Sequence, residues 1–507
     1  MQEIMLNKKL LTAVLSTALI GSGVGPTFVN ADANIENTMD ANMDIQALAQ
    51  SHQGRSIIGD WSGVLETGMM KVTLVLHIHQ DSRGALSASF DTLEHSGTPI
   101  DEITFDGRVL KFEIKRAFAT FEGLLNNEST IFGQFVQAGQ SSSLAFERGI
   151  KSVEVTNRPQ EPKPPFPYTE EAVFYDNLEA GMTLSGTLTL PFSKNPSPVV
   201  LLISGSGPLD RDEALCPYRQ LRHTNIGHKP FLVLADYLTR QGIAVLRWDK
   251  RGCGKSTGNY DKATTQDFAS DVFAGIAYLK SRKEVNPNQI GLIGHSEGGI
   301  IAPMVTAASK DVAFIVLMAG PAVNGEEILY EQSRLAEQAN GKSEETMTQD
   351  HNFQKQLVTI LKKEPDPQIA AGQLCEMAKN HMAALQGTRG KVNLAMLERC
   401  GQNTQWWRYF LLFDPSTALK QVKIPVLALN GELDVQVSPS QNLPIMSKAL
   451  EEAGNKDVTI ALLPKLNHFF QTCQDGSYAE YAKIEETIAP SALNLIAEWI
   501  LERTIQK

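Results

Sequence analysis

The sequence lacks several features, and each absence narrows the range of functions. Lys and Arg (46) are outnumbered by Asp and Glu (57), so the formal net charge is −11. A nucleic-acid binder needs a basic surface that neutralises phosphates, so this charge argues against a nucleic-acid partner. The five cysteines include no Cys-x-x-Cys pair, so no metal or dithiol site is indicated, and their odd number leaves at least one unpaired. After residue 31, no run is long and apolar enough to span a bilayer.

The first 31 residues have the three-part layout of a secretory signal peptide. Lys8 and Lys9 precede an apolar run over residues 10–24, and residues 29–31 (Val-Asn-Ala) offer a cleavage site. Polar residues and glycines interrupt the run, which makes it short for a membrane anchor. No cysteine lies near the cleavage site, so a lipid anchor is not indicated. We expect an exported protein, periplasmic or secreted, with no integral membrane segment once the signal peptide is removed.

The chain of 507 residues is too long for one ordinary core, so two domains are expected. Short β-rich runs at 72–78, 86–90 and 110–114, separated by turn-forming residues, predict a small all-β domain over residues 32–156, either a barrel or a sandwich. Five prolines then fall between residues 157 and 167. Because prolines at this density cannot join a helix or a sheet, they predict a stiff, extended linker over residues 157–170.

Residues 171–507 show a different sequence pattern, which is typical of an α/β domain. Apolar runs alternate with helix-compatible segments, which predicts a mostly parallel sheet with helices on both faces. The predicted strands fall at residues 199–203, 243–247, 290–293, 314–318, 426–429 and 458–462. Between the fourth and fifth of these strands, residues 325–418 are polar and favour helix. They predict a helical cap over the carboxyl edge of the sheet, where ligands bind.

Residues 294–298 (Gly-His-Ser-Glu-Gly) match the pattern Gly-x-Ser-x-Gly. The pattern alone is weak, but a buried strand precedes it and a helix-compatible stretch follows it, as a nucleophile elbow requires. Such a turn lifts the hydroxyl of Ser296 off the sheet edge. Gly294 and Gly298 leave room where the neighbouring backbone crowds the strained serine.

A serine hydroxyl becomes a good nucleophile when a base takes its proton. In folds with this elbow, the partners follow in the order serine, acid, histidine. His468 is the one histidine of ten that follows the acid candidates, and it comes just after a predicted strand. Asp434 is the preferred acid and Glu432 the alternative; the acid would hold the imidazole in the right tautomer. A histidine that only packs beside aromatic residues is the alternative for His468.

An oxyanion hole needs backbone donors aimed at the developing negative charge. One predicted donor is the amide of Glu297, the residue after the nucleophile. The other is the amide of Ser206 in the glycine-rich loop 204–208, although an ordinary glycine turn is an equal alternative for that loop. Residues 249–256 end in Gly-Lys-Ser, but Asp249 stands where a phosphate-binding loop requires glycine, so that function is rejected.

These motifs together resemble a known family. The pieces that carry the resemblance are 204–212 (Ser-Gly-Ser-Gly-Pro-Leu-Asp-Arg-Asp), 249–256, 294–299, 431–434 (Gly-Glu-Leu-Asp) and 467–468. They are similar to those of bacterial α/β-hydrolase carboxylesterases with an extra amino-terminal β domain, and the core is similar to the prolyl-oligopeptidase-like branch. The resemblance covers residues 170–507. It implies a serine esterase of short acyl chains that needs no metal or cofactor, with Ser296, Asp434 and His468 as its triad.

We therefore expect an α/β-hydrolase fold with a helical cap, acting on a small-molecule ester through an acyl-enzyme. Trp406, Trp407 and Phe410 in the cap either wall an acyl pocket or only pack the cap onto the core. The alternatives are a serine peptidase, an acyl thioesterase or acyltransferase of the same fold, and a non-catalytic binding module. The natural substrate, the role of the β domain, the disulfide pairing and the oligomeric state stay open.

Overall fold

The chain forms two units, and each has its own sheet. The smaller unit contains the described residues up to 149, and the larger contains those from 157 onward. The computed structural model describes residues 56–67, 70–92, 95–115, 119–127, 129–137, 140–149, 157–214, 227–339, 343–385, 404–481 and 483–504. The predicted signal peptide therefore lies outside the described residues.

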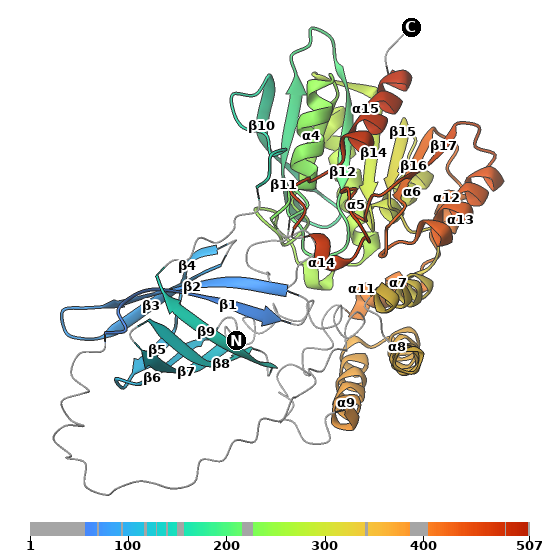
Figure 1. Cartoon of the computed structure of the whole chain (residues 1–507). Helices are drawn as coiled ribbons and strands as arrows, with labels where there is room; N and C mark the ends of the chain where they lie inside the picture. The colour runs from blue at the N-terminus through green and yellow to red at the C-terminus, as the bar shows by residue number, and fades with distance from the viewer. Residues whose placement is uncertain are drawn as a thin grey trace, which may run out of the picture. The chain divides into compact units, whose positions relative to one another are not determined.

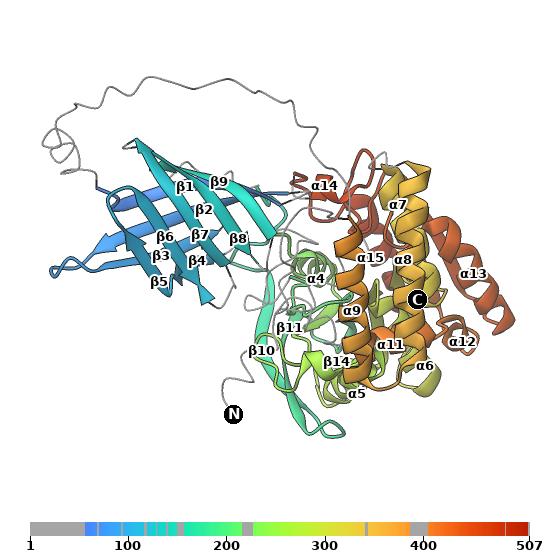
Figure 2. The same cartoon turned by 90° about the horizontal axis from the view of Figure 1, so that it is seen from below.

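The smaller unit is a single antiparallel sheet of nine strands (Figures 1 and 2). The order is β4-β3-β2-β1-β9-β8-β7-β6-β5, so the first strand pairs with both the second and the last. The strands are β1 (Gly59–Thr67), β2 (Met70–Gln80), β3 (Leu86–Thr92), β4 (His95–Pro99), β5 (Glu102–Phe105), β6 (Val109–Ile114), β7 (Ala119–Asn127), β8 (Thr130–Gln137) and β9 (Gln140–Arg148).

Alternate residues of these strands point into one apolar core, as the pleat requires. In β6, Leu110 and Phe112 are buried while Lys111 between them is exposed. Phe121 lies 5.1 Å from Phe112 and 5.3 Å from Phe146 between ring centroids, so aromatic side chains fill much of the interior. One sheet around one core is closer to the predicted barrel than to the predicted sandwich.

The proline-rich segment has neither helix nor strand from residue 157 to 167, and it lies on the larger unit. Arg158 donates to the Ile484 carbonyl at 2.9 Å, and Gln160 donates to the Ile488 carbonyl at 2.7 Å. The predicted linker, 157–170, is three residues too long, because strand β10 already begins at Tyr168. Residues 168–177 pair with β11 along their whole length, and buried and exposed residues alternate from Val173 to Asn177.

The larger unit has an eight-stranded sheet in the order β10-β11-β13-β12-β14-β15-β16-β17. The pairs β10–β11 and β11–β13 are antiparallel, and all the pairs from β13 to β17 are parallel. The strands are β10 (Tyr168–Asn177), β11 (Met182–Pro191), β12 (Ser197–Ile203), β13 (Ala244–Trp248), β14 (Val285–His295), β15 (Phe314–Met318), β16 (Val426–Gly431) and β17 (Val458–Leu463). This arrangement confirms the α/β fold class expected from the alternating pattern.

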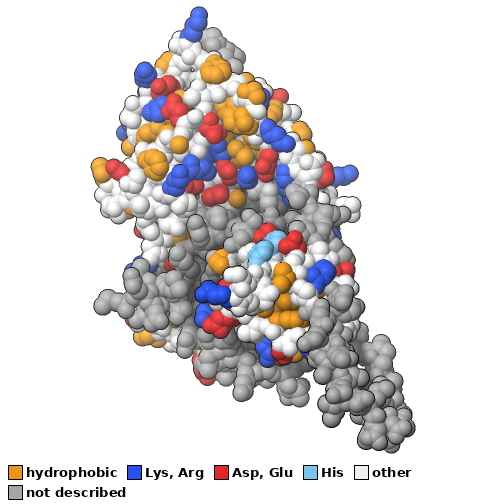
Figure 3. All heavy atoms as spheres, turned by 90° about the vertical axis from the view of Figure 1, so that its left-hand side faces the viewer, with side chains coloured by type: hydrophobic (Ala, Val, Ile, Leu, Met, Phe, Trp, Pro, Cys, Tyr) orange, Lys and Arg blue, Asp and Glu red, His pale blue; other side chains and the backbone are white. Residues whose placement is uncertain are grey.

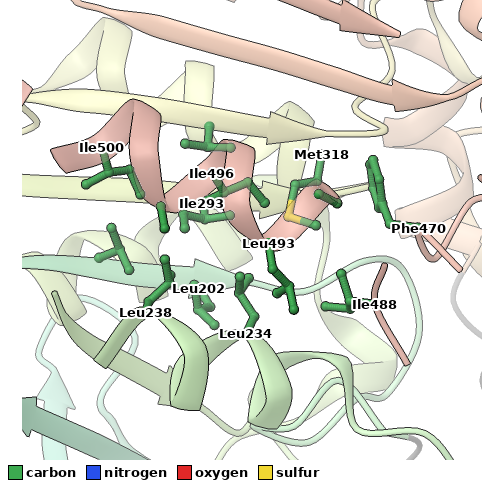
Figure 4. Close-up of a cluster of buried hydrophobic side chains, with 14 of the residues drawn as sticks. Leu202, Leu234, Leu238, Ile293, Met318, Phe470, Ile488, Leu493, Ile496 and Ile500 are labelled. Atoms are coloured by element: carbon green, nitrogen blue, oxygen red, sulfur yellow. The ribbon is translucent and has the colours of Figure 1, made fainter. Parts of the chain in front are cut away.

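Helices cover both faces of this sheet, and the side chains of β12 show why. Leu202 points to the face covered by α4 (Pro230–Arg240) and α15 (Pro490–Thr504), where Leu234 and Ile496 pack against it in one core (Figure 4). Leu201 points to the opposite face and contacts Gly275 of α5 (Thr265–Lys280). A strand buried on both sides has no need of polar residues, which explains the unbroken apolar run at 199–203.

Between β15 and β16 the described residues are helical, as predicted for the cap. The helices are α7 (Gly325–Ala339), α8 (Glu344–Lys363), α9 (Pro367–Leu385), α11 (Thr404–Leu412) and α12 (Ser416–Leu419). In Figure 1 the first four of these helices form one group, below the eight-stranded sheet. Helices α6 (Gly298–Ala308), α13 (Pro439–Glu452) and α14 (Tyr478–Tyr481) complete the larger unit.

The surface carries charges of both signs. On the face shown in Figure 3, Lys and Arg side chains are interspersed with Asp and Glu, and the described part of that face has no continuous basic stripe. This pattern fits the net charge of −11. Within the described ranges, no helix is both long and apolar enough to cross a membrane.

Candidate active site

Ser296 lies at the turn between strand β14 and helix α6. Its φ is +52°, in the left-handed region that residues other than glycine rarely occupy. Backbone strain of this kind costs about 1–3 kcal/mol and persists only where the surroundings fix it. Here the Ser296 amide donates to the Met318 carbonyl at the end of β15, at 2.9 Å. The turn therefore holds the serine at the carboxyl edge of the sheet.

Two glycines make this turn possible. A Cβ added to Gly294 would lie 2.1 Å from the carbonyl oxygen of Gly298, and one added to Gly298 would lie 2.0 Å from the carbonyl oxygen of Ile203. Real Cβ atoms essentially never approach within 3.0 Å of another heavy atom. The crowding predicted around the serine from the sequence is therefore present, and it comes from backbone atoms that cannot move aside.

Asp434 and His468 form a buried pair. His468 Nδ1 lies 2.8 Å from Asp434 Oδ2, and the two side chains are 4% and 0% exposed. Asp434 follows β16 and His468 follows β17, which are parallel neighbours in the sheet. Their loops therefore leave the same edge. Glu432, the alternative acid, is exposed and accepts from the Lys465 amide at 3.0 Å, so the structure brings Asp434 and not Glu432 to the histidine.

The hydrogen bonds of Asp434 define the tautomer of His468. Oδ1 accepts from the amides of Gln436 (2.8 Å) and Val437 (2.9 Å), and Oδ2 also accepts from Asn430 Nδ2 (3.0 Å). A carboxylate with only accepting oxygens needs a donor at His468 Nδ1. The proton therefore resides on Nδ1, and Nε2 is left as the basic nitrogen. This is the tautomer that a general base uses.

A second buried histidine, His295, lies beside His468, with 4.8 Å between the ring centroids. Its Nε2 donates to the His468 carbonyl at 3.0 Å, and its Nδ1 lies 2.8 Å from Glu213 Oε1. Burial lowers the pKa of His295, but the negative charge and hydrogen bond of Glu213 raise it by more, so the net pKa is above the ordinary value. His295 therefore connects the Glu213 carboxylate to the backbone of His468 through its two ring nitrogens.

The glycine-rich loop after β12 lies directly against the nucleophile. A Cβ added to Gly205 would be 3.2 Å from Ser296 Cβ. The Gly205 amide donates to Glu213 Oε1 at 2.7 Å, which fixes this end of the loop. Ser206, the next residue, is exposed, and Glu297, the other predicted donor, lies at the start of helix α6. The structure therefore brings both predicted donor residues to the edge where Ser296 lies.

The side chain of Glu297 joins three elements through buried contacts. Oε2 lies 3.2 Å from Lys250 Nζ, and Oε1 accepts from Thr265 Oγ1 (2.8 Å) and from Trp406 Nε1 (2.6 Å). Lys250 Nζ also donates to the Gly205 carbonyl at 2.5 Å. The elbow, the glycine-rich loop and cap helix α11 are thus connected at one point.

The segment 249–256, rejected as a phosphate-binding loop, has a structural use. Asp249 binds the guanidinium of Arg211 at 2.6 Å and 3.0 Å, and Arg211 lies three residues after the glycine-rich loop. Arg251 binds Asp271 of α5 at 2.8 Å. The amide of Lys255, which a phosphate-binding loop would turn to its ligand, donates to Asp249 Oδ2 at 3.1 Å. This segment therefore supports the chain just after the glycine-rich loop, through the contact between Asp249 and Arg211.

Sequence reasoning missed Glu213, Lys250 and His295 as parts of this site. One signal was available: Lys250 follows the buried strand β13 by two residues and His295 ends the buried, mostly apolar second half of β14, and such positions rarely tolerate an unpaired charge. No comparable signal marks Glu213, because its φ of +61° and its partner become visible only in the folded chain.

The aromatic residues of the cap pack together. Trp406 stacks on Phe410 at 5.1 Å and meets Trp407 edge to face at 4.9 Å, and all three lie on α11. Phe410 also packs against Val323 and its neighbours in a small apolar cluster. These contacts favour the packing alternative over a wall made by all three side chains, and only Trp406 reaches the elbow, through Glu297.

Within the described residues, no group of three or more His, Cys, Asp or Glu side chains is placed to hold a metal ion. Cys473 is a buried free thiol whose Sγ lies 3.5 Å from the Lys465 carbonyl. Burial raises the pKa of this thiol to about 11. A thiol held protonated near neutral pH is a poor nucleophile, so Ser296 is the better candidate at this edge.

Three comparisons relate this chain to known proteins. Residues 180–463 match the X-Pro dipeptidyl-peptidase (S15) family. Esterase EstD of Thermotoga maritima is 26% identical over 322 residues, which is 63% of this chain and 66% of EstD, just under two thirds of its length. Among solved structures, the α/β hydrolase GrgF of a Penicillium species has 16% identity and a TM-score of 0.40, covering 66% of this chain and 99% of that one. The Pyrococcus furiosus esterase Pf2001 has 16% identity and a TM-score of 0.38, covering 71% of this chain and 100% of that one.

Proposed function

The chain belongs to the X-Pro dipeptidyl-peptidase (S15) family of α/β hydrolases, and from this membership and the geometry of its site we propose that it is a serine carboxylesterase. Ser296 is the nucleophile, His468 the general base and Asp434 the acid that orients it. The observation that carries the proposal is the buried 2.8 Å hydrogen bond between His468 and Asp434, at the sheet edge where the strained turn holds Ser296.

The reaction follows from these positions. His468 Nε2 takes the proton of Ser296 Oγ as that oxygen bonds to the ester carbonyl carbon. The carbonyl oxygen becomes an anion, held by the amides of Ser206 and Glu297. When the tetrahedral intermediate collapses, the bond to the alcohol oxygen breaks, and the alcohol leaves with the proton from His468. Water then attacks the acyl-enzyme by the same steps, which releases the acid and restores Ser296.

Short acyl chains are the proposed substrates. The indole of Trp406 is bound to Glu297, the residue next to the nucleophile, and from this contact we place cap helix α11 beside the acyl group of the substrate. A long acyl chain would need this contact to open. The name of EstD, an esterase, favours ester substrates over amides.

The name of the family makes a dipeptidyl peptidase the second candidate. Such an enzyme must hold the free amino group of its substrate, and a buried carboxylate is the natural partner for that charge. Two buried glutamates near the nucleophile are already engaged, Glu213 with His295 and Glu297 with Lys250. This engagement favours the esterase.

Both candidates can be tested with chromogenic substrates that release similar leaving groups. We expect the full chain to hydrolyse p-nitrophenyl acetate and butyrate much faster than the palmitate, and to leave Ala-Pro-p-nitroanilide intact. Faster cleavage of the anilide than of the esters would favour the peptidase. Hydrolysis of none of these substrates would refute the proposed function.

We also propose that the protein is exported after removal of residues 1–31. The support is the sequence pattern of Lys8, Lys9 and the apolar run over residues 10–24. Amino-terminal sequencing of the protein recovered outside the cytoplasm should start at residue 32. A protein that keeps its first residues and stays in the cytoplasm would contradict this.

A further inference from the structure

The predicted oxyanion donor of the glycine-rich loop is fixed through its own peptide unit. The Ser206 N–H and the Gly205 C=O belong to the same planar trans peptide, so they point in opposite directions. Lys250 Nζ binds the Gly205 oxygen at 2.5 Å. Whatever holds that oxygen therefore sets the direction of the Ser206 N–H. A charged donor on the carbonyl also polarises the peptide and strengthens the N–H as a donor.

Lys250 is an unusual residue to find in this place. Its side chain is 1% exposed, and its ammonium lies 4.5 Å from the centre of the Phe268 ring and 3.2 Å from Glu297 Oε2. Lysine is almost never fully buried unless it is paired. A buried ion pair is a poor source of stability, because desolvation offsets much of the attraction between the charges. Stability alone therefore gives little reason for this pair.

Glu297 supplies the other end of the connection. Its backbone amide is the second predicted oxyanion donor, and its carboxylate holds Lys250. The ion pair therefore joins the two peptide units whose N–H groups would share one oxyanion. The carboxylate belongs to the residue of one predicted donor and is connected to the other through Lys250.

The same carboxylate is bound to the cap. Trp406 Nε1 donates to Glu297 Oε1 at 2.6 Å, and Trp406 lies on α11, which packs against α7, α8 and α9. Thr265 at the start of α5 holds Oε1 from the other side, at 2.8 Å. Oε1 is therefore placed by one group from the core and one from the cap, while Lys250 holds Oε2. Docking of α11 decides whether the second is present.

We propose that Lys250 and Glu297 are positioning residues that couple docking of the cap, through Trp406, to the orientation of the oxyanion donors. The inference rests on the proposed function, because it concerns the same serine site. It goes further in giving the cap a part in the chemical step: with α11 docked the two amides converge, and with α11 displaced the Ser206 amide loses its fixed direction.

A single pair of variants tests the link to the cap. Trp406→Phe removes the indole N–H and keeps an aromatic ring, and Trp407→Phe makes the same change one residue away on the same helix. For p-nitrophenyl butyrate, we expect Trp406→Phe to lower kcat about tenfold with little change in KM, because a misdirected oxyanion donor affects the transition state more than substrate binding. Trp407→Phe should keep kcat within about twofold of the unmodified protein.

A tetrahedral analogue separates an effect on the position of the oxyanion donors from a general loss of packing in the cap. A butyl trifluoromethyl ketone forms a serine adduct whose oxyanion occupies the proposed hole. Its affinity should fall in Trp406→Phe by the same factor as kcat/KM, whereas loss of packing alone would lower the thermal midpoint of both tryptophan variants. If Trp406→Phe and Trp407→Phe have equal effects on kcat, the inference is overturned.

A double-mutant cycle tests the route through the ion pair. If Trp406 acts through Glu297 and Lys250, then Trp406→Phe should have little further effect on kcat in a Lys250→Met background. Fold-losses that multiply would overturn the inference. If Lys250→Met does not fold, Glu297→Gln replaces it, since the amide keeps an oxygen for Trp406 and removes the charge that faces Lys250. Wild-type hydrolysis and fluorophosphonate labelling of Ser296 separate these outcomes from a failure of the proposed function itself.

Discussion

Replacing Asp434 by Asn tests the tautomer argument at the centre of the site. The amides of Gln436 and Val437 both point at Oδ1, so the oxygen of the new side chain must take that position. Its NH₂ group then replaces Oδ2 and faces His468 Nδ1. It donates to Nδ1, so the imidazole proton moves to Nε2, the nitrogen that should accept the proton of Ser296.

The expected loss is large because the base is then in the wrong form. A histidine held in this tautomer is expected to lower kcat by about 10⁴-fold, which is about 5 kcal/mol of transition-state stabilisation at 1.36 kcal/mol per tenfold. The new NH₂ group also faces the buried Asn430 Nδ2, another donor. This unsatisfied contact should lower the free energy of unfolding by about 1–3 kcal/mol.

The assay is steady-state hydrolysis of p-nitrophenyl butyrate, with urea unfolding measured on the same samples. Glu432→Gln is the matched control, because it makes the same chemical change two residues away on an exposed side chain that does not bind His468. It should keep full activity. An Asp434→Asn protein that is folded and within about tenfold of wild type would refute the tautomer argument, and so would a Glu432→Gln protein with the larger loss.

Two further predictions concern the supports of the site. Gly298→Ala places a Cβ 2.0 Å from a backbone oxygen of β12, so the free energy of unfolding in urea should fall by about 3 kcal/mol. Gly372→Ala, at an exposed position of α9 where nothing lies within 4 Å of the added Cβ, should raise it by about 0.5–1 kcal/mol. Because Glu213 raises the pKa of His295, the stability from this pair is complete below the unfolded value of 6.5 and is lost as the pH rises through the higher folded-state value. Glu213→Gln should therefore flatten the decline of the urea midpoint above pH 6.5, and equal declines in both proteins would count against the pair.

The sequence predicts the architecture of the larger unit well because each central strand is a continuous apolar run. Residues 199–203 and 314–318 carry this signal without interruption, and both are strands in the structure. The edge hairpin was missed: β10 is partly exposed and alternates, and it begins one residue after a run of prolines that indicates a linker. Helix α15 was also missed, since a terminal helix lies outside the strand–helix alternation that was used.

For the site, chain order and local pattern could be read from the sequence, but long-range partners could not. Ser296 stands in a local motif, and His468 is the one histidine in the required order. Two of the partners of Glu297 are Lys250, 47 residues away, and Trp406, 109 residues away. Neither separation has a local signature, because burial of a charged pair is decided by the packing of the whole domain. The link between the cap and the oxyanion loop therefore appears only in the structure.

The measurement that tests the central claim most directly is covalent labelling of the full chain with a fluorophosphonate, followed by peptide mapping. We expect one adduct, on the peptide that contains Ser296, and loss of esterase activity in step with labelling. Ser296→Ala should abolish both, while Ser309→Ala, at the other end of helix α6, should change neither. Esterase activity that survives in Ser296→Ala, or an adduct on a different serine, would contradict the assignment of Ser296 as the nucleophile.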